Sequence, residues 1–121
     1  LTVAQKPFAR AAEEIDEIDL ENVIKKVKPT ILIGCSAQAD AFTESIIREM
    51  AKHVARPVIL PLSNPTEQAE AKPIDLVQWT QGRALIATGS PFPAVKYQGN
   101  HLSIAQCNNA LVFPGIGLGI S

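Results

Sequence analysis

The sequence is poor in aromatic residues, has no run of basic residues and contains no long apolar stretch. Aromatic residues make up 5% of the 121 residues, too few for a surface that stacks the bases of single-stranded nucleic acid. The formal net charge is −1, and without a basic cluster a nucleic-acid partner is not expected. No apolar stretch approaches the roughly 20 residues that cross a bilayer. We therefore expect neither a nucleic-acid nor a membrane partner.

Cysteine is also scarce. The two cysteines, Cys35 and Cys107, lie far apart without a CxxC spacing. A disulfide framework is therefore not expected, and a reduced, cytoplasmic protein is the better interpretation. The first 30 residues are rich in Asp, Glu and Lys and lack the pattern of a signal peptide. The chain starts at Leu1 rather than at Met, so we expect it to be a piece of a longer protein.

Three apolar runs, at 30–34, 58–62 and 84–87, predict three strands of a parallel sheet. Their starts are about 25 residues apart, the spacing that helical crossovers between parallel strands need. The first run is continuously apolar, which is typical of a strand covered on both faces. Hydrophobic residues make up 46% and charged residues 19% of the chain, the balance of a globular domain. We therefore predict the α/β class.

Helix signals fill the gaps between these strands. Asp19 and Thr43 are expected as N-caps of helices over 20–28 and 44–54. Asn64 followed by Pro65 predicts a third helix, with the Asn as its cap. The first helix is expected to bury Leu20, Val23, Ile24 and Val27. The remaining predictions are an irregular lead-in over 1–18, a helix over 74–81, a hairpin of 95–97 with 102–104, and a short helix from about 108.

Small polar residues follow each predicted strand, at the edge where parallel sheets bind ligands. Ser36, Ser63 and Ser90 could line a pocket there, although none lies in a GxSxG nucleophile motif. Asn64 reads either as a helix cap or as a ligand contact, and the two roles are compatible. The pair Asn108 and Asn109 exceeds what one cap needs, which favours a functional role for the surplus amide.

Several other features carry less chemistry. Cys35 is expected to be a small buried thiol. His53 and His101 have no partner at metal-ligand spacing, so we interpret them as surface or structural residues. The glycines at 115, 117 and 119 follow a predicted helix, which is the wrong context for a phosphate loop. No glycine-rich turn joins a strand to a helix, and the chain therefore looks like the second half of a Rossmann-type doubly wound sheet.

The order of several segments is more specific than any single motif. These are Lys28-Pro29-Thr30-Ile31-Leu32-Ile33-Gly34, Phe42-Thr43-Glu44, Arg48-Glu49-Met50-Ala51, Arg56-Pro57-Val58-Ile59, Ser63-Asn64-Pro65-Thr66, Ala69-Glu70, Trp79-Thr80-Gln81-Gly82-Arg83-Ala84, Thr88-Gly89-Ser90-Pro91-Phe92, Asn108-Asn109-Ala110 and Phe113-Pro114-Gly115-Ile116-Gly117-Leu118-Gly119. Over nearly the whole chain they resemble malic enzymes and the related malolactic enzymes.

The resemblance implies that residues 1–121 are a partial NAD(P)-binding domain. It implies a parent enzyme that converts L-malate to pyruvate and CO₂ with NAD or NADP and with Mg²⁺ or Mn²⁺. Asn64 and Asn108 match the family's malate-binding residues, with Asn109 beside them. The segment Ile33-Gly34-Cys35-Ser36, together with Asn64, would contact the cofactor. A homo-oligomeric parent is also implied.

The family's catalytic Tyr and Lys, substrate Arg, three carboxylate metal ligands and phosphate loop have no counterpart here. The resemblance thus implies no catalytic residue and no metal ligand in this segment, which should be inactive alone. Two alternatives stay open: a malolactic enzyme, which releases lactate, and a non-catalytic α/β binding module. The loop 36–40 also departs from the family, because it lacks the usual glycines. Asp40 is the residue of this loop that best tolerates a left-handed backbone.

Overall fold

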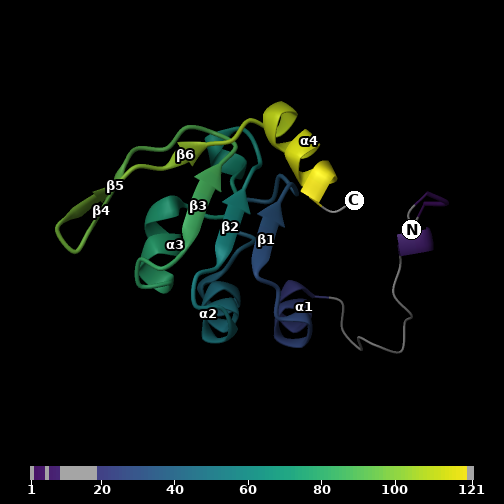
Figure 1. Ribbon diagram of the computed structural model, residues 1–121, viewed down its shortest axis with the longest axis horizontal. Coiled ribbons are helices and arrows are strands. Elements are labelled where there is room, and N and C mark those ends of the chain that lie inside the picture. Colours follow the sequence, from purple (N-terminus) through teal and green to yellow (C-terminus); the bar gives the residue numbers. More distant parts are fainter. Residues whose placement is uncertain (1, 5, 9–18, 120–121) are drawn as a thin grey trace.

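A parallel sheet of four strands, in the order β1-β2-β3-β6, forms the centre of the computed structural model (Figure 1). The structure describes residues 2–4, 6–8 and 19–119. The strands are β1 (Ile31–Gly34), β2 (Val58–Pro61), β3 (Leu85–Thr88) and β6 (Ala105–Gln106). The α/β class and the three predicted strands are confirmed. The fourth strand was not predicted, because two residues are too short to show a period.

Helices connect or flank these strands. They are η1 (Lys6–Phe8), α1 (Leu20–Val27), α2 (Glu44–His53), η3 (Thr66–Gln68), α3 (Pro73–Trp79) and α4 (Asn109–Gly119). The strands β4 (Val95–Tyr97) and β5 (Asn100–Leu102) form a separate antiparallel hairpin. In the sequence this hairpin lies between β3 and β6, and Figure 1 shows it projecting from the body of the molecule.

The two faces of the sheet are covered differently. Leu32 and Ile59 point to the face that α1, α2 and α3 cover, where they join a core with Ile24, Ile47, Met50 and Leu76. On the other face α4 lies across β1 and β2, and a hollow of about 520 Å³ separates them. The hollow is lined by Ile31, Ile33, Val58 and Leu60 of the sheet and by Val112, Gly115, Ile116 and Gly119 of α4.

This arrangement corrects the prediction that the first strand is covered on both faces. Ile31 is 54% exposed and Ile33 is 37% exposed, because a hollow separates them from α4 on that face. Val27 was also predicted to be buried, but it is 41% exposed. It lies in the last turn of α1, next to Lys28, whose left-handed backbone (φ 50°) ends the helix.

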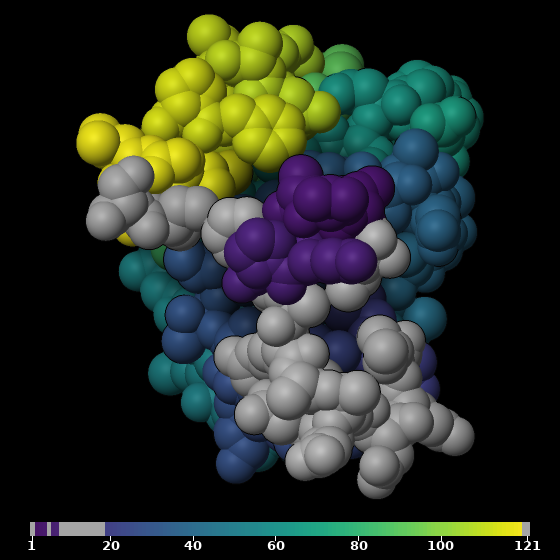
Figure 2. Space-filling view, turned by 90° about the vertical axis from the view of Figure 1, so that its right-hand side faces the viewer, coloured from purple at the N-terminus to yellow at the C-terminus, as the bar shows by residue number. Residues whose placement is uncertain are grey.

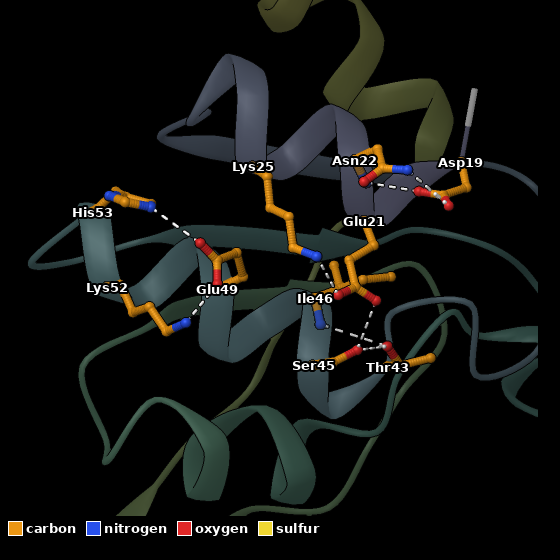
Figure 3. A network of polar contacts seen from close by, with 10 residues as sticks. All are labelled: Asp19, Glu21, Asn22, Lys25, Thr43, Ser45, Ile46, Glu49, Lys52 and His53. Atoms are coloured by element: carbon orange, nitrogen blue, oxygen red, sulfur yellow. Dashed lines mark hydrogen bonds and ion pairs between the residues drawn. The ribbon is translucent and has the colours of Figure 1, made fainter. Parts of the chain in front are cut away.

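Both predicted N-caps are present. The Asp19 carboxylate accepts a hydrogen bond from Asn22 N at 2.6 Å, and Thr43 Oγ1 accepts one from Ile46 N at 3.5 Å. Figure 3 shows both caps within a polar network on α1 and α2. Ser45 Oγ joins the helices by donating to Glu21 at 3.2 Å. Such exposed contacts contribute little free energy, so the apolar core must hold these helices together.

The remaining predictions hold in part. The hairpin turn contains only Gln98 and Gly99, both at positive φ, as a tight two-residue turn requires. Strand β5 therefore starts at Asn100 and ends before the predicted Ile104. In the predicted lead-in, residues 6–8 form a single 3₁₀ turn, and 9–18 lie outside the described residues. No helix in the described part of the chain has the length and apolar character needed to span a membrane.

Hydrogen bonds from the Arg83 side chain link the C-terminal end of α2 to the segment just before β3. Its guanidinium donates four hydrogen bonds to backbone carbonyls: Nη1 to Val54 at 3.2 Å and Ala55 at 3.0 Å, Nη2 to Ala51 at 3.1 Å, and Nε to Thr80 at 3.1 Å. Three of these carbonyls lie at the C-terminal end of α2, where backbone acceptors lack partners within the helix. Arg83 thus satisfies acceptors that the helix itself leaves free.

We predict that Arg83→Ala lowers the free energy of unfolding of the intact protein by about 1.5–3 kcal/mol, the range for lost hydrogen bonds to a charged group. The control is Arg56→Ala, which removes the same charge from an exposed position in the preceding loop. Chemical denaturation of both variants measures the effect. Equal midpoints for the two variants would contradict this role of Arg83.

Candidate functional site at the carboxyl edge of the sheet

The four parallel strands end in register. At the ends of the strands, three backbone hydrogen bonds join neighbouring strands: Leu62 N to Gly34 O at 2.9 Å, Gly89 N to Pro61 O at 3.0 Å, and Cys107 N to Thr88 O at 2.8 Å. The loops that follow β1, β2, β3 and β6 therefore start from one edge. Figure 1 shows this edge at the top of the sheet, and Figure 2 shows α4 and the teal segment after β2 at the same end.

Glu70 lies beneath this edge and is fully buried, with 0% of its surface exposed. Its carboxylate accepts four hydrogen bonds from two loops. Oε1 accepts from Ser36 N at 2.8 Å and Ser36 Oγ at 3.0 Å, and also from Ser63 Oγ. Oε2 accepts from Ser63 N at 3.4 Å. The sequence reasoning gave Glu70 no role, although its buried neighbours Ala69 and Ala71 form an acid-in-apolar pattern that could have pointed to it.

The backbone around Glu70 is built for the carboxylate. A Cβ added to Gly34 would lie 2.5 Å from Glu70 Cδ, so the absence of a side chain at this position makes room for the acid. Burial raises the pKa of Glu70, but the hydrogen bonds from Ser63 and Ser36 outweigh it and hold the pKa below its ordinary value. The group is therefore an anion at neutral pH, and its role is to accept hydrogen bonds.

Asn64 does not cap a helix, which corrects that part of the prediction. The short helix η3 begins after Pro65, and no side chain caps it. Asn64 instead bridges two strand ends: its Oδ1 accepts from Ser90 Oγ at 2.6 Å and its Nδ2 donates to Leu62 O at 3.3 Å. The amide is exposed at the edge of the sheet. The predicted ligand contact of Asn64 is thus geometrically accessible.

Of the two adjacent asparagines, Asn108 caps the last helix, whereas the side-chain oxygen of Asn109 makes no hydrogen bond within the described residues. Asn108 Oδ1 accepts from Ala110 N at 2.9 Å, and Asn108 O accepts from Leu111 N at 2.9 Å, as an N-cap of α4 does. The Nδ2 of this exposed side chain donates to no group among the described residues. Asn109 Oδ1 is buried and has no hydrogen-bond partner in the described part of the chain.

The predicted cofactor segment Ile33-Gly34-Cys35-Ser36 lines a hollow of about 410 Å³ at the end of β1. Gly34 is buried, whereas the other three residues are exposed. The exposure of Cys35 corrects the prediction of a buried thiol. Partial burial and the negative charge of Glu70 both raise the pKa of Cys35. The thiol is therefore protonated at neutral pH and unsuited to act as a nucleophile.

The loop after β1 contains two left-handed residues. The predicted one, Asp40, has φ 57°, but Ala37 also has φ 54°. Ala37 N donates to Ser63 Oγ at 2.9 Å, so a contact from the β2 loop supports a backbone conformation that is unfavourable for Ala. The β1 loop is further held by Asp40 N to Ala69 O at 3.2 Å and Phe42 N to Glu70 O at 2.9 Å.

Metal-binding chemistry has no visible basis in the described residues. No group of three His, Cys, Asp or Glu side chains is arranged there to hold a metal ion. His53 contacts Glu49 at 3.2 Å on the surface of α2 (Figure 3), away from the edge of the sheet. The arrangement at the edge can bind and orient a polar ligand through amides and hydroxyls.

Comparisons with known proteins agree on one family. The family model "Malic enzyme, NAD binding domain" matches residues 1–121. The chain is 59% identical over 124 residues to NAD-dependent malic enzyme 3 of Bacillus subtilis, an alignment that covers 95% of this chain and 22% of the relative. It is 60% identical over 105 residues to NAD-dependent malic enzyme of Photorhabdus laumondii, with 87% and 19% covered.

A more distant relative extends the same match. NAD-dependent malic enzyme of Acinetobacter baylyi is 52% identical over 123 residues, covering 96% of this chain and 22% of the relative. The chain thus spans about a fifth of the length of these curated relatives.

We predict that Gly89→Ala disrupts the edge of the sheet. An added Cβ would lie 2.0 Å from Leu62 O, so the loops after β2 and β3 would have to separate. Such overpacking costs typically about 1–3 kcal/mol or more of unfolding free energy, measurable by denaturation of the intact protein. The control is Gly115→Ala in α4, where no described atom apart from the neighbouring helix backbone lies within 4 Å of the added Cβ. That change should be neutral or stabilising, because Ala favours a helix by about 0.5–1 kcal/mol. Equal effects of the two changes would refute the close approach at Gly89.

Proposed function

This chain belongs to the malic enzyme NAD-binding domain family, and we propose that its parent protein converts L-malate to pyruvate and CO₂ with NAD⁺. One observation carries the proposal: the residues that the family resemblance marks as ligand-binding, Asn64, Asn108, Asn109 and the segment 33–36, follow or end strands that share one edge of the sheet. Asn64 and Ser90 are hydrogen-bonded there at 2.6 Å, and Cys107 N, directly before Asn108, bonds to Thr88 O at 2.8 Å.

The chemistry of these residues suits malate, a small dianion. Neutral amides donate hydrogen bonds to carboxylates without adding charge, and they hold a substrate in one orientation. Asn64, Asn108 and Asn109 are proposed to bind malate. Asn108 Nδ2 is exposed and uncommitted among the described residues, so the amide can cap α4 with its oxygen and bind substrate with its nitrogen.

The hollow at the end of β1 fits the proposed cofactor segment, 33–36. It offers apolar walls from Leu20, Leu32 and Phe42 beside the hydroxyl of Ser36 and the nearby backbone, a mixture typical of small-molecule sites. Bound NAD⁺ would supply the acceptor for the hydride that malate loses. The residues of this chain bind and orient the two ligands, and Asn64 is proposed to contact both.

Other properties are proposed for the parent protein as a whole. Its Mg²⁺ or Mn²⁺ ligands and its acid–base groups would lie outside this segment, which would therefore be inactive by itself. A cytoplasmic location and a homo-oligomeric state are proposed on the same family basis. NAD⁺ is preferred over NADP⁺ because the relatives named above are NAD-dependent.

The deciding assay uses the intact parent protein with L-malate, Mn²⁺ and either NAD⁺ or NADP⁺. We expect pyruvate together with an equal amount of reduced NAD, followed by absorbance and by analysis of the organic product. Lactate without net cofactor reduction would instead assign a malolactic activity. No turnover by a folded protein would overturn the proposal in favour of a binding module.

A second prediction separates substrate binding by Asn108 from helix capping. Asn108→Asp keeps an acceptor for Ala110 N, so the cap is preserved, but it replaces an amide donor with a charge that repels malate. We expect the KM for malate to rise more than about tenfold, since a lost hydrogen bond to a charged group costs about 1.5–3 kcal/mol.

The matched control for this variant is Asn100→Asp, which adds the same charge to the exposed hairpin. Steady-state kinetics with saturating NAD⁺ give the two KM values, and melting temperatures verify that the cap is intact. An unchanged malate KM for Asn108→Asp would leave Asn108 as a helix cap alone.

A further inference from the structure

Among the described residues, Glu70 is the one buried charged side chain that contacts the loops after both β1 and β2. It holds Ser36 of the first loop and Ser63 of the second on the same oxygen, Oε1. Ser63 Oγ in turn accepts from Ala37 N at 2.9 Å, which closes a ring of contacts between the loops. A displacement of either loop would break contacts in the other.

These loops carry different sets of proposed ligand contacts. The first supplies 34–36 to the cofactor, and the second supplies Asn64, directly after Ser63, to malate and to the cofactor. We propose that Glu70 is a positioning residue that fixes the cofactor-binding loop and the substrate-binding loop at one separation. This inference rests on the proposed function, and it adds a residue that contacts neither ligand but sets the distance between the two.

A carboxylate suits this position better than its neutral analogue. Glu70 meets donors on both oxygens, including two backbone N–H groups, Ser36 N and Ser63 N. A glutamine would have to direct its NH₂ group at one of these donors, because only one of its terminal atoms accepts. The hydrogen bonds that stabilise the anion also hold the pKa of Glu70 below its ordinary value, which agrees with a group that is ionised at neutral pH.

The test compares Glu70→Gln with Glu67→Gln in the intact parent protein. Glu67 lies three residues earlier on η3 and is exposed, so its change removes the same charge from the same segment without removing any of the hydrogen bonds of Glu70. For each variant we would measure the melting temperature, the Kd for NAD⁺, and the KM and kcat with malate.

We expect Glu70→Gln to raise both the Kd for NAD⁺ and the KM for malate by about tenfold or more, as for other lost hydrogen bonds to charged groups. Glu67→Gln should change neither. If Glu70 is merely structural, the variant will instead have a lower melting temperature and a lower kcat from fewer active molecules, with Kd and KM unchanged. That result would overturn the inference.

Ser63→Ala provides a second test if Glu70→Gln does not fold. The change removes from the loop after β2 the hydroxyl that contacts Glu70 and Ala37. We expect the Kd for NAD⁺ to rise by about threefold to tenfold, within the range for a single lost hydrogen bond. An unchanged Kd would contradict the coupling.

Failure of the proposed activity can be distinguished from failure of this inference. A wild-type protein that binds NAD⁺ without converting malate would overturn the activity alone, and the ratio of NAD⁺ dissociation constants would still judge Glu70. A wild-type protein that binds no NAD⁺ would overturn both.

Discussion

A buried charge must be surrounded by hydrogen-bond donors, and the donors around Glu70 come from two separate loops. Leaving such a carboxylate without partners would cost several kcal/mol. Its four hydrogen bonds therefore constrain Ser36 and Ser63 to their observed positions. The constraint extends to Ala37, whose left-handed backbone is supported by Ser63. The shape of the candidate site thus depends on one side chain that is itself hidden from solvent.

The close approach of backbone segments completes this constraint. Gly34 leaves room for the Glu70 carboxylate, and Gly89 lets the loop after β3 lie against Leu62 O. Both glycines have ordinary backbone angles rather than positive φ, so their role is spatial. Because parallel strands end at one edge, a shift of a few tenths of an ångström at either glycine would alter the separation of several loops at once.

Local signals in the sequence predicted the elements of the fold well. Asp19 and Thr43 act as caps because their side chains bond to backbone groups three residues away, a relation that the sequence contains. The contacts of Glu70 with Ser36 span 34 residues, and those of Asn64 with Ser90 span 26. Such contacts exist only after the strands have paired. The sequence therefore predicted that the strand ends share one edge of the sheet but not the hydrogen bonds that shape that edge.

The incorrect predictions for Asn64 and Cys35 also arise because long-range contacts are not visible in the local sequence. Asn is a residue type that favours helix N-caps, yet the amide of Asn64 accepts a hydrogen bond from Ser90 at the end of the neighbouring strand. Ser90 becomes available as a partner only in the folded sheet. Cys35 is small and apolar, which predicts burial, but its position past a strand end leaves it exposed. In both cases a tertiary position outweighs a local preference.

The two adjacent asparagines at the start of α4 show how far the geometry supports a binding role. A cap uses one acceptor, and Asn108 Oδ1 provides it. The remaining groups, Asn108 Nδ2 and the buried Asn109 Oδ1, have no partners among the described residues. A buried acceptor without a hydrogen bond costs about 1–3 kcal/mol, and a donor that arrives with a ligand or with another part of the protein would offset this cost. The start of α4 thus supplies its own cap and leaves other amide groups without partners among the described residues.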